Sequence, residues 1–216
     1  MPIPKTRARI VDVARKLFAR VGVENTTMND IAKASGKGRR TVYTYFQSKE
    51  ELYWAVVESE LEILSEMMRR VSLKSIRPDR KIMEMIYTRL DAVKEVVLRN
   101  GTLRANFFRD IWGVEKVRKK FDQREIELFE HVLQEGVEMG VFNINNVRMT
   151  ATVMHYCVKG IEVPHIRGQI APNVDTEQRK RIVADMVLGA LRQVDYDLLD
   201  GVHHESKQRK HVGGLL

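Results

Sequence analysis

Residues 26–52 read TTMNDIAKASGKGRRTVYTYFQSKEEL, and this stretch decides our prediction of the fold. A threonine followed three residues later by an acid, as in TMND at 27–30, is a capping box and predicts that a short helix begins there. The pattern recurs in SKEE at 48–51 and predicts the start of a longer helix. Between the two boxes, GKG at 36–38 provides a turn. Two short helices joined by a glycine turn predict a helix-turn-helix over residues 27–46.

The flanking residues supply a helix on each side of this pair. Apolar residues recur three and four positions apart between Ile10 and Val21, which predicts a helix from about Thr6 to Arg20. A long helix is expected from Ser48 through Met68, with apolar residues along its whole length. This long helix belongs both to the helix-turn-helix and to the remainder of the chain, so we expect a rigid connection between them.

The remainder of the chain also favours helix. No proline occurs in residues 5–77 or 79–163, and no run of alternating apolar and polar residues indicates a strand. Apolar residues at helical spacing predict further helices near residues 82–97, 103–112, 117–137, 146–163 and 176–198. A loop is expected at 164–175. We therefore predict an all-α fold of about nine helices. The expected division is a helix-turn-helix domain at 1–50, a helical ligand-binding and dimerisation domain at 51–202, and a disordered tail at 203–216.

The positive charge of the chain is concentrated at one end. Residues 1–50 contain 11 Lys and Arg but 4 Asp and Glu, an excess of +7 within a total of +8. Residues 51–216 are nearly balanced. A solubilising surface would account for such an excess, but an asymmetry of this size favours a module that binds a polyanion. Together with the helix-turn-helix, it predicts binding to double-stranded DNA.

The second helix of the pair would read the DNA. Arg39 and Arg40 lie on its first turn, where an arginine can bond guanine with two hydrogen bonds. Thr41 offers a methyl group and a hydroxyl. Tyr43 and Tyr45 offer hydroxyls to phosphates, although packing in a core is an alternative for both. Three further cations precede or open the first helix, and they are either a basic arm on the DNA or a solvated terminus: Lys5, Arg7 and Arg9.

The order of these residues resembles the tetracycline-repressor (TetR) family of bacterial regulators over about residues 6–57. The resemblance rests on TTMNDIA at 26–32, ASG at 34–36, TVYTYF at 41–46 and SKEEL at 48–52. It implies a homodimer, a palindromic operator and a ligand pocket in the C-terminal body. The DNA contacts that it implies fall on Thr27, Arg39, Arg40, Thr41, Tyr43, Tyr45 and Lys49. Lys37, Gly38 and Arg40 depart from the family's usual pattern, so no relative's operator can be assumed.

The ligand pocket and the dimer interface have weaker signals. Aromatic and methionine side chains of the body suit a pocket for an apolar small molecule, although they also fill ordinary cores. The pocket candidates are Met67, Met83, Phe107, Phe108, Trp112 and Tyr156. The last two expected helices carry more apolar surface than one core-facing stripe requires, which favours a dimer interface. The interface candidates are Met154, Val158, Ile161, Val183, Val187, Ala190, Leu191 and Val194.

Other function classes find little support in the sequence. It contains no phosphate-binding glycine loop, HExxH, GxSxG or CxxC, so we expect no enzyme, no cofactor and no metal site. No apolar run has the length of a signal peptide or a membrane span, and Cys157 is the single cysteine, so we expect a cytoplasmic, nucleoid-associated protein. The sequence predicts a transcriptional regulator, most simply a repressor released by a ligand. Two alternatives stay open. One is a DNA-binding factor of the same fold without an effector, controlled by a protein partner or organising the chromosome. The other is a helical interaction module or enzyme whose basic end is only a solvated surface.

Overall fold

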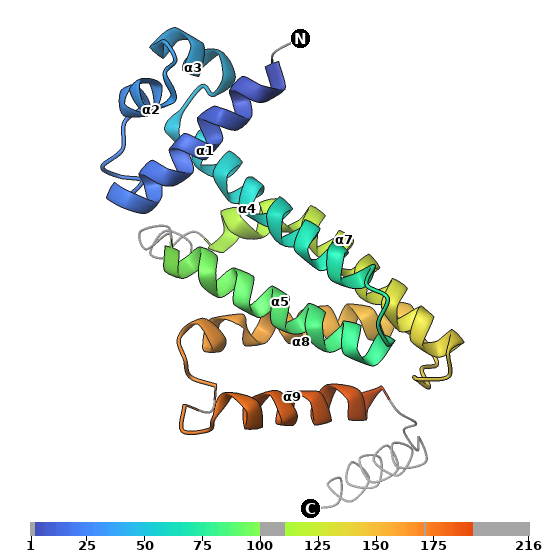
Figure 1. Ribbon diagram of the computed structural model, residues 1–216. Coiled ribbons are helices and arrows are strands. Elements are labelled where there is room, and N and C mark those ends of the chain that lie inside the picture. Colours follow the sequence, from blue (N-terminus) through green and yellow to red (C-terminus); the bar gives the residue numbers. More distant parts are fainter. Residues whose placement is uncertain (1–2, 100–110, 171, 192–216) are drawn as a thin grey trace, which may run out of the picture.

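The computed structural model describes residues 3–99, 111–170 and 172–191. Within these residues the chain forms eight helices and no strand (Figure 1). The helices are α1 (Ile3–Val21), α2 (Met28–Ser35), α3 (Arg39–Tyr45), α4 (Lys49–Ser72), α5 (Pro78–Arg99), α7 (Ile111–Glu138), α8 (Val147–Ile166) and α9 (Thr176–Ala190). The predicted all-α class is confirmed, and the count is close to the nine expected. The tail at 203–216 lies outside the described residues.

The caps of α2 and α4 form as their sequences predict. Thr27 Oγ1 accepts a hydrogen bond from the backbone of Asp30 at 3.2 Å, and the Asp30 carboxylate accepts one from the backbone of Thr27 at 2.9 Å. Gly36 ends α2 in the left-handed conformation at φ 66°. At the start of α4, Ser48 Oγ accepts a hydrogen bond from the backbone N–H of Glu51 at 3.0 Å, as in a capping box. The Glu51 carboxylate accepts its hydrogen bond from the backbone N–H of Gln47, one residue before the position that a capping box uses.

Helices α1 to α3 and the first turns of α4 share one apolar core. Its fully buried members, which come from all four helices, include Ile10, Phe18, Ile31, Val42, Phe46, Leu52 and Val56. This core fixes the angle between α2 and α3, which is what a helix-turn-helix requires.

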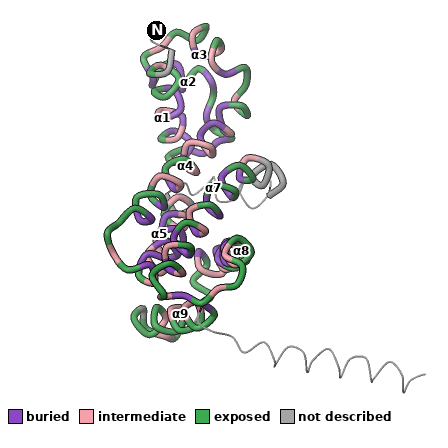
Figure 2. The backbone as a smooth tube through the Cα atoms, turned by 90° about the vertical axis from the view of Figure 1, so that its right-hand side faces the viewer, coloured by how far each residue is buried: buried purple, intermediate pink, exposed green. Residues whose placement is uncertain are grey.

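A second apolar core fills the body. It is built from α4, α5, α7 and α8 and includes Met68, Ile82, Ile86, Phe129, Leu133, Ala151 and Val158. Helix α9 lies beside α5 and α8 and is the most exposed of these helices (Figures 1 and 2). The Tyr87 hydroxyl of α5 donates to the carbonyl of Lys180 at 3.2 Å and holds α9 in place.

Helix α4 connects the two cores, and the segment between them is charged. Three glutamates at alternate positions of α4 pair with other helices. Glu58 and Glu62 pair with Lys120 and Arg124 of α7, and Glu60 pairs with Arg15 of α1. The junction between the DNA-binding end and the body is therefore electrostatic rather than apolar.

Three predicted boundaries need correction. Helix α8 continues through Pro164 to Ile166, where a loop was expected, because the side chain of Ile166 is buried and Pro164 costs only one backbone bond in the last turn. Helix α1 begins earlier than Thr6, with Pro4 in its first turn. Helix α7 begins at Ile111 and so includes the end of the segment expected at 103–112. Among the described helices, none combines the length and the apolar composition of a membrane span.

Candidate functional site

The outer surface of α3 carries the strongest candidate for a nucleic-acid interface. Val42 and Phe46 are fully buried and fix this short helix on the core. Opposite to them, Arg39, Arg40 and Thr44 are exposed. Both arginines stand on the first turn of the helix, where the Gly38 cap makes no side-chain hydrogen bond. In the described part of the chain no carboxylate pairs with either guanidinium, so both charges face solvent.

Contacts within the domain give the two arginines different settings. The Arg39 guanidinium lies over the ring of Tyr43, with 5.6 Å to the ring centroid. Arg40 has no such ring contact, and its carbonyl accepts a hydrogen bond from the Thr44 hydroxyl at 3.0 Å. Thr44 is an outward-facing residue that the sequence prediction did not include. Its signal was present, because it lies four residues after Arg40 and so on the same helical face.

Two cations of α1 extend this basic surface. The Arg7 guanidinium lies 5.1 Å from the centroid of the Phe46 ring, at the end of α3. Arg9 reaches toward Gly36, since a Cβ placed on that glycine would lie 3.8 Å from its Nη2. The first turns of α1 therefore stand next to the turn between α2 and α3 (Figure 1). Both side chains are exposed.

Two of the remaining predicted DNA contacts, Thr27 and Lys49, already have hydrogen-bond partners within the chain. Thr27 Oγ1 donates to the Asp30 carboxylate at 2.6 Å, and this hydrogen bond is the main reason that the pKa of Asp30 lies below its usual range. The Lys49 ammonium donates to the carbonyls of Val23 and Glu24, at 2.8 and 3.2 Å. In this conformation Lys49 joins the start of α4 to the segment before α2. Thr41, Tyr43 and Tyr45 are half-buried at the sides of α3.

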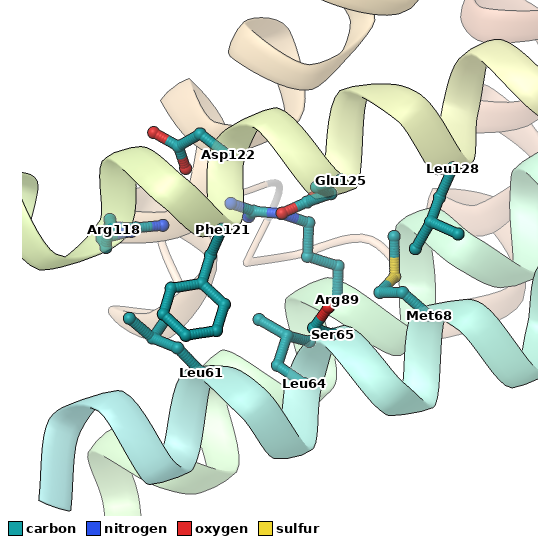
Figure 3. Close-up of a pocket in the computed structure, with 10 residues that line it drawn as sticks. All are labelled: Leu61, Leu64, Ser65, Met68, Arg89, Arg118, Phe121, Asp122, Glu125 and Leu128. Atoms are coloured by element: carbon teal, nitrogen blue, oxygen red, sulfur yellow. The ribbon is translucent and has the colours of Figure 1, made fainter. Parts of the chain in front are cut away.

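The body contains a narrow pocket between α4 and α7 (Figure 3). One wall is apolar, with Leu61, Leu64 and Met68 from α4 and Phe121 and Leu128 from α7. The remaining lining is polar, and consists of Ser65, Arg89, Arg118, Asp122 and Glu125. The space inside corresponds to about one water molecule.

Four of these polar lining residues belong to a larger, mostly buried group of seven side chains on α5, α7 and α8, which we call the charge cluster. Its members are Arg89, Arg118, Asp122, Glu125, His155, Lys159 and Glu162. Glu162 accepts from Arg118 Nη2 at 3.0 Å with each of its oxygens, and it also pairs with Arg89. Arg89 further pairs with Glu125. Figure 3 shows the Arg89 side chain extending from below to reach Glu125 on α7.

Asp122, His155 and Lys159 complete the charge cluster. Lys159 Nζ donates to Asp122 Oδ2 at 2.8 Å. His155 is fully buried, with Nε2 3.5 Å from Asp122 Oδ1 and Nδ1 3.6 Å from Glu125 Oε1. Burial alone would raise the pKa of Asp122, but the nearby His155 ring and the hydrogen bond from Lys159 outweigh it and lower this pKa to about 2.

None of the residues predicted to line a ligand pocket lines the pocket between α4 and α7. Met67 and Tyr156 are exposed on α4 and α8, and Met83 is half-buried on α5. Trp112 belongs to α7, but its side chain is outside the description, as are Phe107 and Phe108 altogether. The described pocket is formed instead by residues on α4, α5 and α7 whose proximity depends on tertiary packing.

The residues predicted to form a dimer interface divide into two groups. Met154, Val158 and Leu191 are buried in the chain's own core, and this leaves them no surface to offer a partner. Ile161, Val183 and Val187 are half-buried, Ala190 is exposed, and Val194 lies outside the described residues.

Other apolar side chains on the same two helices face solvent. Met149, Val153 and Tyr156 of α8 are 59%, 49% and 55% exposed. Ile182 and Met186 of α9 are 46% and 72% exposed. Burying such side chains against a second copy would be favourable.

Comparisons with known proteins agree with this geometry. Residues 10–56 match the model of the family described as bacterial regulatory proteins, tetR family. YfiR of Bacillus subtilis, an uncharacterized HTH-type transcriptional regulator, is 28% identical over 145 residues, which are 64% of this chain and 68% of YfiR. The crystal structure of a transcriptional regulator from Cytophaga hutchinsonii is 25% identical and superposes with a TM-score of 0.67 over 85% of this chain and 97% of that one. The structure of RolR in complex with the ligand resorcinol has the same fold, with a TM-score of 0.55 and 22% identity over 87% of this chain and 88% of RolR.

Proposed function

We propose that this chain, whose residues 10–56 match the model of the tetR family of bacterial regulatory proteins, is a dimeric repressor that a small molecule releases from a palindromic operator. The observation that carries the proposal is the pair of solvent-facing arginines on the first turn of α3, on a helix anchored by two buried residues. An α-helix fits the major groove, and its first turn reaches the base edges.

Within this proposal the DNA-facing residues take distinct roles. Arg39 and Arg40 read base edges, while Thr41, Thr44 and the hydroxyls of Tyr43 and Tyr45 lie beside them. Arg7 and Arg9 of α1 are placed to meet the phosphate backbone next to the turn. Thr27 and Lys49 serve chiefly to hold α2 and α4 in position.

The exposed apolar side chains of α8 and α9 are the proposed dimer interface. A two-fold axis through this face would present two recognition helices to one side of the DNA. Successive major grooves on one face of B-DNA are about 34–36 Å apart, so a dimer of this kind requires an inverted repeat. The half-buried Ile161, Val183 and Val187 and the exposed Ala190 would flank the contact.

The arrangement of α4 suggests how a ligand would release the DNA. The pocket begins at Leu61, within the charged junction at residues 58–62, and its opposite side is formed by α7. A ligand that enters would separate α4 from α7, and α4 carries the DNA-binding domain with it. A coupling of about 1–3 kcal/mol would lower operator affinity about 5- to 150-fold. RolR, a protein of the same fold, was crystallised with such a small ligand.

A second candidate function is a DNA-binding factor that has no effector. The narrowness of the pocket favours it, because the space present admits little more than one water molecule. Under this alternative the body would serve only as a dimerisation domain. The two candidates share the DNA-binding surface and differ only in whether a small molecule changes operator affinity.

A paired substitution tests the DNA-binding claim. The double variant Arg39→Ala/Arg40→Ala should weaken binding to a fluorescent operator fragment by at least about tenfold, because each arginine contact contributes about 1–3 kcal/mol. The matched control is Arg69→Ala/Arg70→Ala, which removes two adjacent exposed arginines at the far end of α4. Equal affinity of both double variants, with the fold intact by circular dichroism, would overturn the proposal.

A further inference from the structure

The structure gives the two arginines of α3 different positions around the helix. Successive residues of an α-helix are about 100° apart, so Arg40 lies about 160° round the helix from the buried Val42, almost directly opposite the core. Arg39 lies about 60° from Val42, and therefore on the flank of α3. Both arginines are exposed, but they are exposed in different directions.

Arg39 has a partner on its own flank of the helix. Its guanidinium lies 5.6 Å from the centroid of the Tyr43 ring, one helical turn further along. The electron-rich face of an aromatic ring attracts a cation, and this attraction operates at exposed positions as well. The contact with Tyr43 therefore holds Arg39 along the side of α3, away from its outer face.

Arg40 has the longest side chain on the outer face of α3. Thr44 is the other exposed residue there, and its short hydroxyl donates to the Arg40 carbonyl at 3.0 Å, within the helix itself. In the part of the chain that the structure describes, no carboxylate and no aromatic ring holds the Arg40 guanidinium. The outer face therefore offers one planar group of unused N–H donors.

A helix in the major groove of DNA meets two kinds of surface. Its outer face reaches the base edges on the floor of the groove, whereas its flanks face the phosphate backbones that form the walls. A guanidinium matches O6 and N7 of guanine with two hydrogen bonds, and no other base presents two acceptors there. The outer-face position of Arg40 therefore suits a guanine, and the flank position of Arg39 suits a phosphate.

We propose that Arg40 is the specificity-determining residue of α3 and binds one guanine in each half-site of the operator, whereas Arg39 binds a phosphate. This inference rests on the proposed function and narrows it, because there both arginines read base edges. Arg39 then contributes affinity for DNA of any sequence, and Arg40 contributes the choice among sequences. The operator must contain a G·C pair at the same place in each half of its inverted repeat.

Modified DNA tests the guanine contact on the unaltered chain. The bound sequence is first selected from random double-stranded DNA, and each guanine position is then replaced in both half-sites by 7-deazaguanine, which pairs normally but lacks the N7 acceptor. At one position the affinity should fall about tenfold, within the range for an arginine–guanine contact. A selected site without guanine, or one in which no guanine position responds, would overturn the proposal.

Two single variants assign the guanine contact to one arginine. In Arg40→Ala the replacement by 7-deazaguanine should cause no further loss, because the group that binds N7 is already absent. Arg39→Ala is the matched control on the adjacent residue. It should bind all sequences more weakly and with a shallower salt dependence, yet keep the tenfold response to 7-deazaguanine. A response that persists in Arg40→Ala, or that disappears in Arg39→Ala alone, contradicts the assignment. Both side chains are exposed, and circular dichroism checks that both variants fold.

The same measurements separate this inference from the proposed function. If the unaltered chain selects an inverted repeat but Arg40→Ala responds to 7-deazaguanine as the unaltered chain does, only the role of Arg40 is wrong. If the unaltered chain binds no DNA, the proposed function fails and this inference fails with it. Selection of a guanine-containing repeat, with a response to 7-deazaguanine that depends on Arg40, is the result that both predict.

Discussion

Arg15 of α1 and Glu60 of α4 form an ion pair, with 3.4 Å between Nε and Oε1, at the point where the two apolar cores of the chain separate. Glu60 is 6% exposed, although the side chains of Glu58 and Glu62, two residues away on either side, are 40% and 63% exposed. The pair joins the first helix of the DNA-binding domain to the helix that continues into the body. Among the described helices, α4 is the one that contributes residues to both cores. A movement that passes from one core to the other along the chain therefore passes through the helix that holds Glu60.

Glu60→Gln should destabilise the chain, because it removes the buried one of the two carboxylates that pair with the partly buried guanidinium of Arg15 and leaves only the more exposed Asp12. We expect a loss of about 1–3 kcal/mol in the free energy of unfolding. Urea denaturation followed by circular dichroism measures it. The control is Glu62→Gln, on the same helix, whose 63% exposed side chain pairs with Arg124 and should contribute about 0–1 kcal/mol. An equal loss of unfolding free energy in the two variants would show that the buried Arg15–Glu60 pair contributes no more to stability than an exposed pair.

Lys49→Ala should reduce stability and DNA affinity together. The ammonium holds the carbonyls of Val23 and Glu24, and loss of these hydrogen bonds should cost about 1–2 kcal/mol. Arg40→Ala, by contrast, should lower DNA affinity while stability changes by less than about 0.5 kcal/mol, as is usual for surface positions. Thermal unfolding and fluorescence anisotropy on both variants check this. A Lys49→Ala protein with unchanged stability would return Lys49 to the role of a direct DNA contact.

Gly136→Ala should strongly destabilise the body. A Cβ at this position would lie 2.1 Å from Cδ2 of Phe142, a buried ring that closes the turn after α7. Overpacking of this kind costs about 1–3 kcal/mol or more. Gly160→Ala is the control, since a Cβ there meets no atom within 4 Å and should instead favour helix by about 0.5–1 kcal/mol. Comparable melting temperatures for the two variants would contradict the close packing described.

His155 should make the stability of the body depend on pH. Burial lowers the pKa of His155 in the folded chain, but Asp122 and Glu125 outweigh burial and raise this pKa above the ordinary value of 6.5. Its contribution is therefore complete below pH 6.5 and is lost as the pH rises through the higher folded-state pKa. The difference in unfolding free energy between the natural chain and His155→Gln should shrink from pH 6 toward higher pH. A difference that grows with pH would contradict an imidazolium.

Met186→Glu tests the proposed dimer interface and should convert the proposed dimer to a monomer. Met186 is 72% exposed on α9, and a charge placed there would be buried, unpaired, against the partner. The dissociation constant of the dimer should rise by at least about tenfold, as for loss of a central interface residue. Sedimentation velocity measures the change. Met139→Glu is the control, because Met139 is also exposed but follows the end of α7 and belongs to neither α8 nor α9. Loss of the dimer in the control alone would place the interface elsewhere.

The sequence predicts the DNA-binding end well because its signals are local. The capping residues Thr27 and Ser48 and the Gly36 turn act within a few residues of themselves, so α2, α3 and the start of α4 follow from them. The glycine at 38 also behaves as its chemistry predicts, since it leaves α3 without a side-chain cap.

The body is harder to predict because its decisive contacts are distant in the chain. Arg89 and Glu162 are 73 residues apart, and neither has a local pattern that announces a buried ion pair. Periodicity shows that α8 is apolar, but not that Val158 faces the core while Val153 faces solvent. The packing of α5, α7 and α8 makes that choice, so neither the pocket lining nor the exposed face of α8 could be derived from the sequence.

Selection of bound sequences from a random pool of double-stranded DNA tests the central claim most directly. We expect the full chain to enrich an inverted repeat whose half-sites lie about 34–36 Å apart along the DNA axis. Arg39→Ala/Arg40→Ala should enrich no such repeat from the same pool. Enrichment of no sequence by the unaltered chain, or of a single site without a repeat, would contradict a dimer that reads DNA through α3.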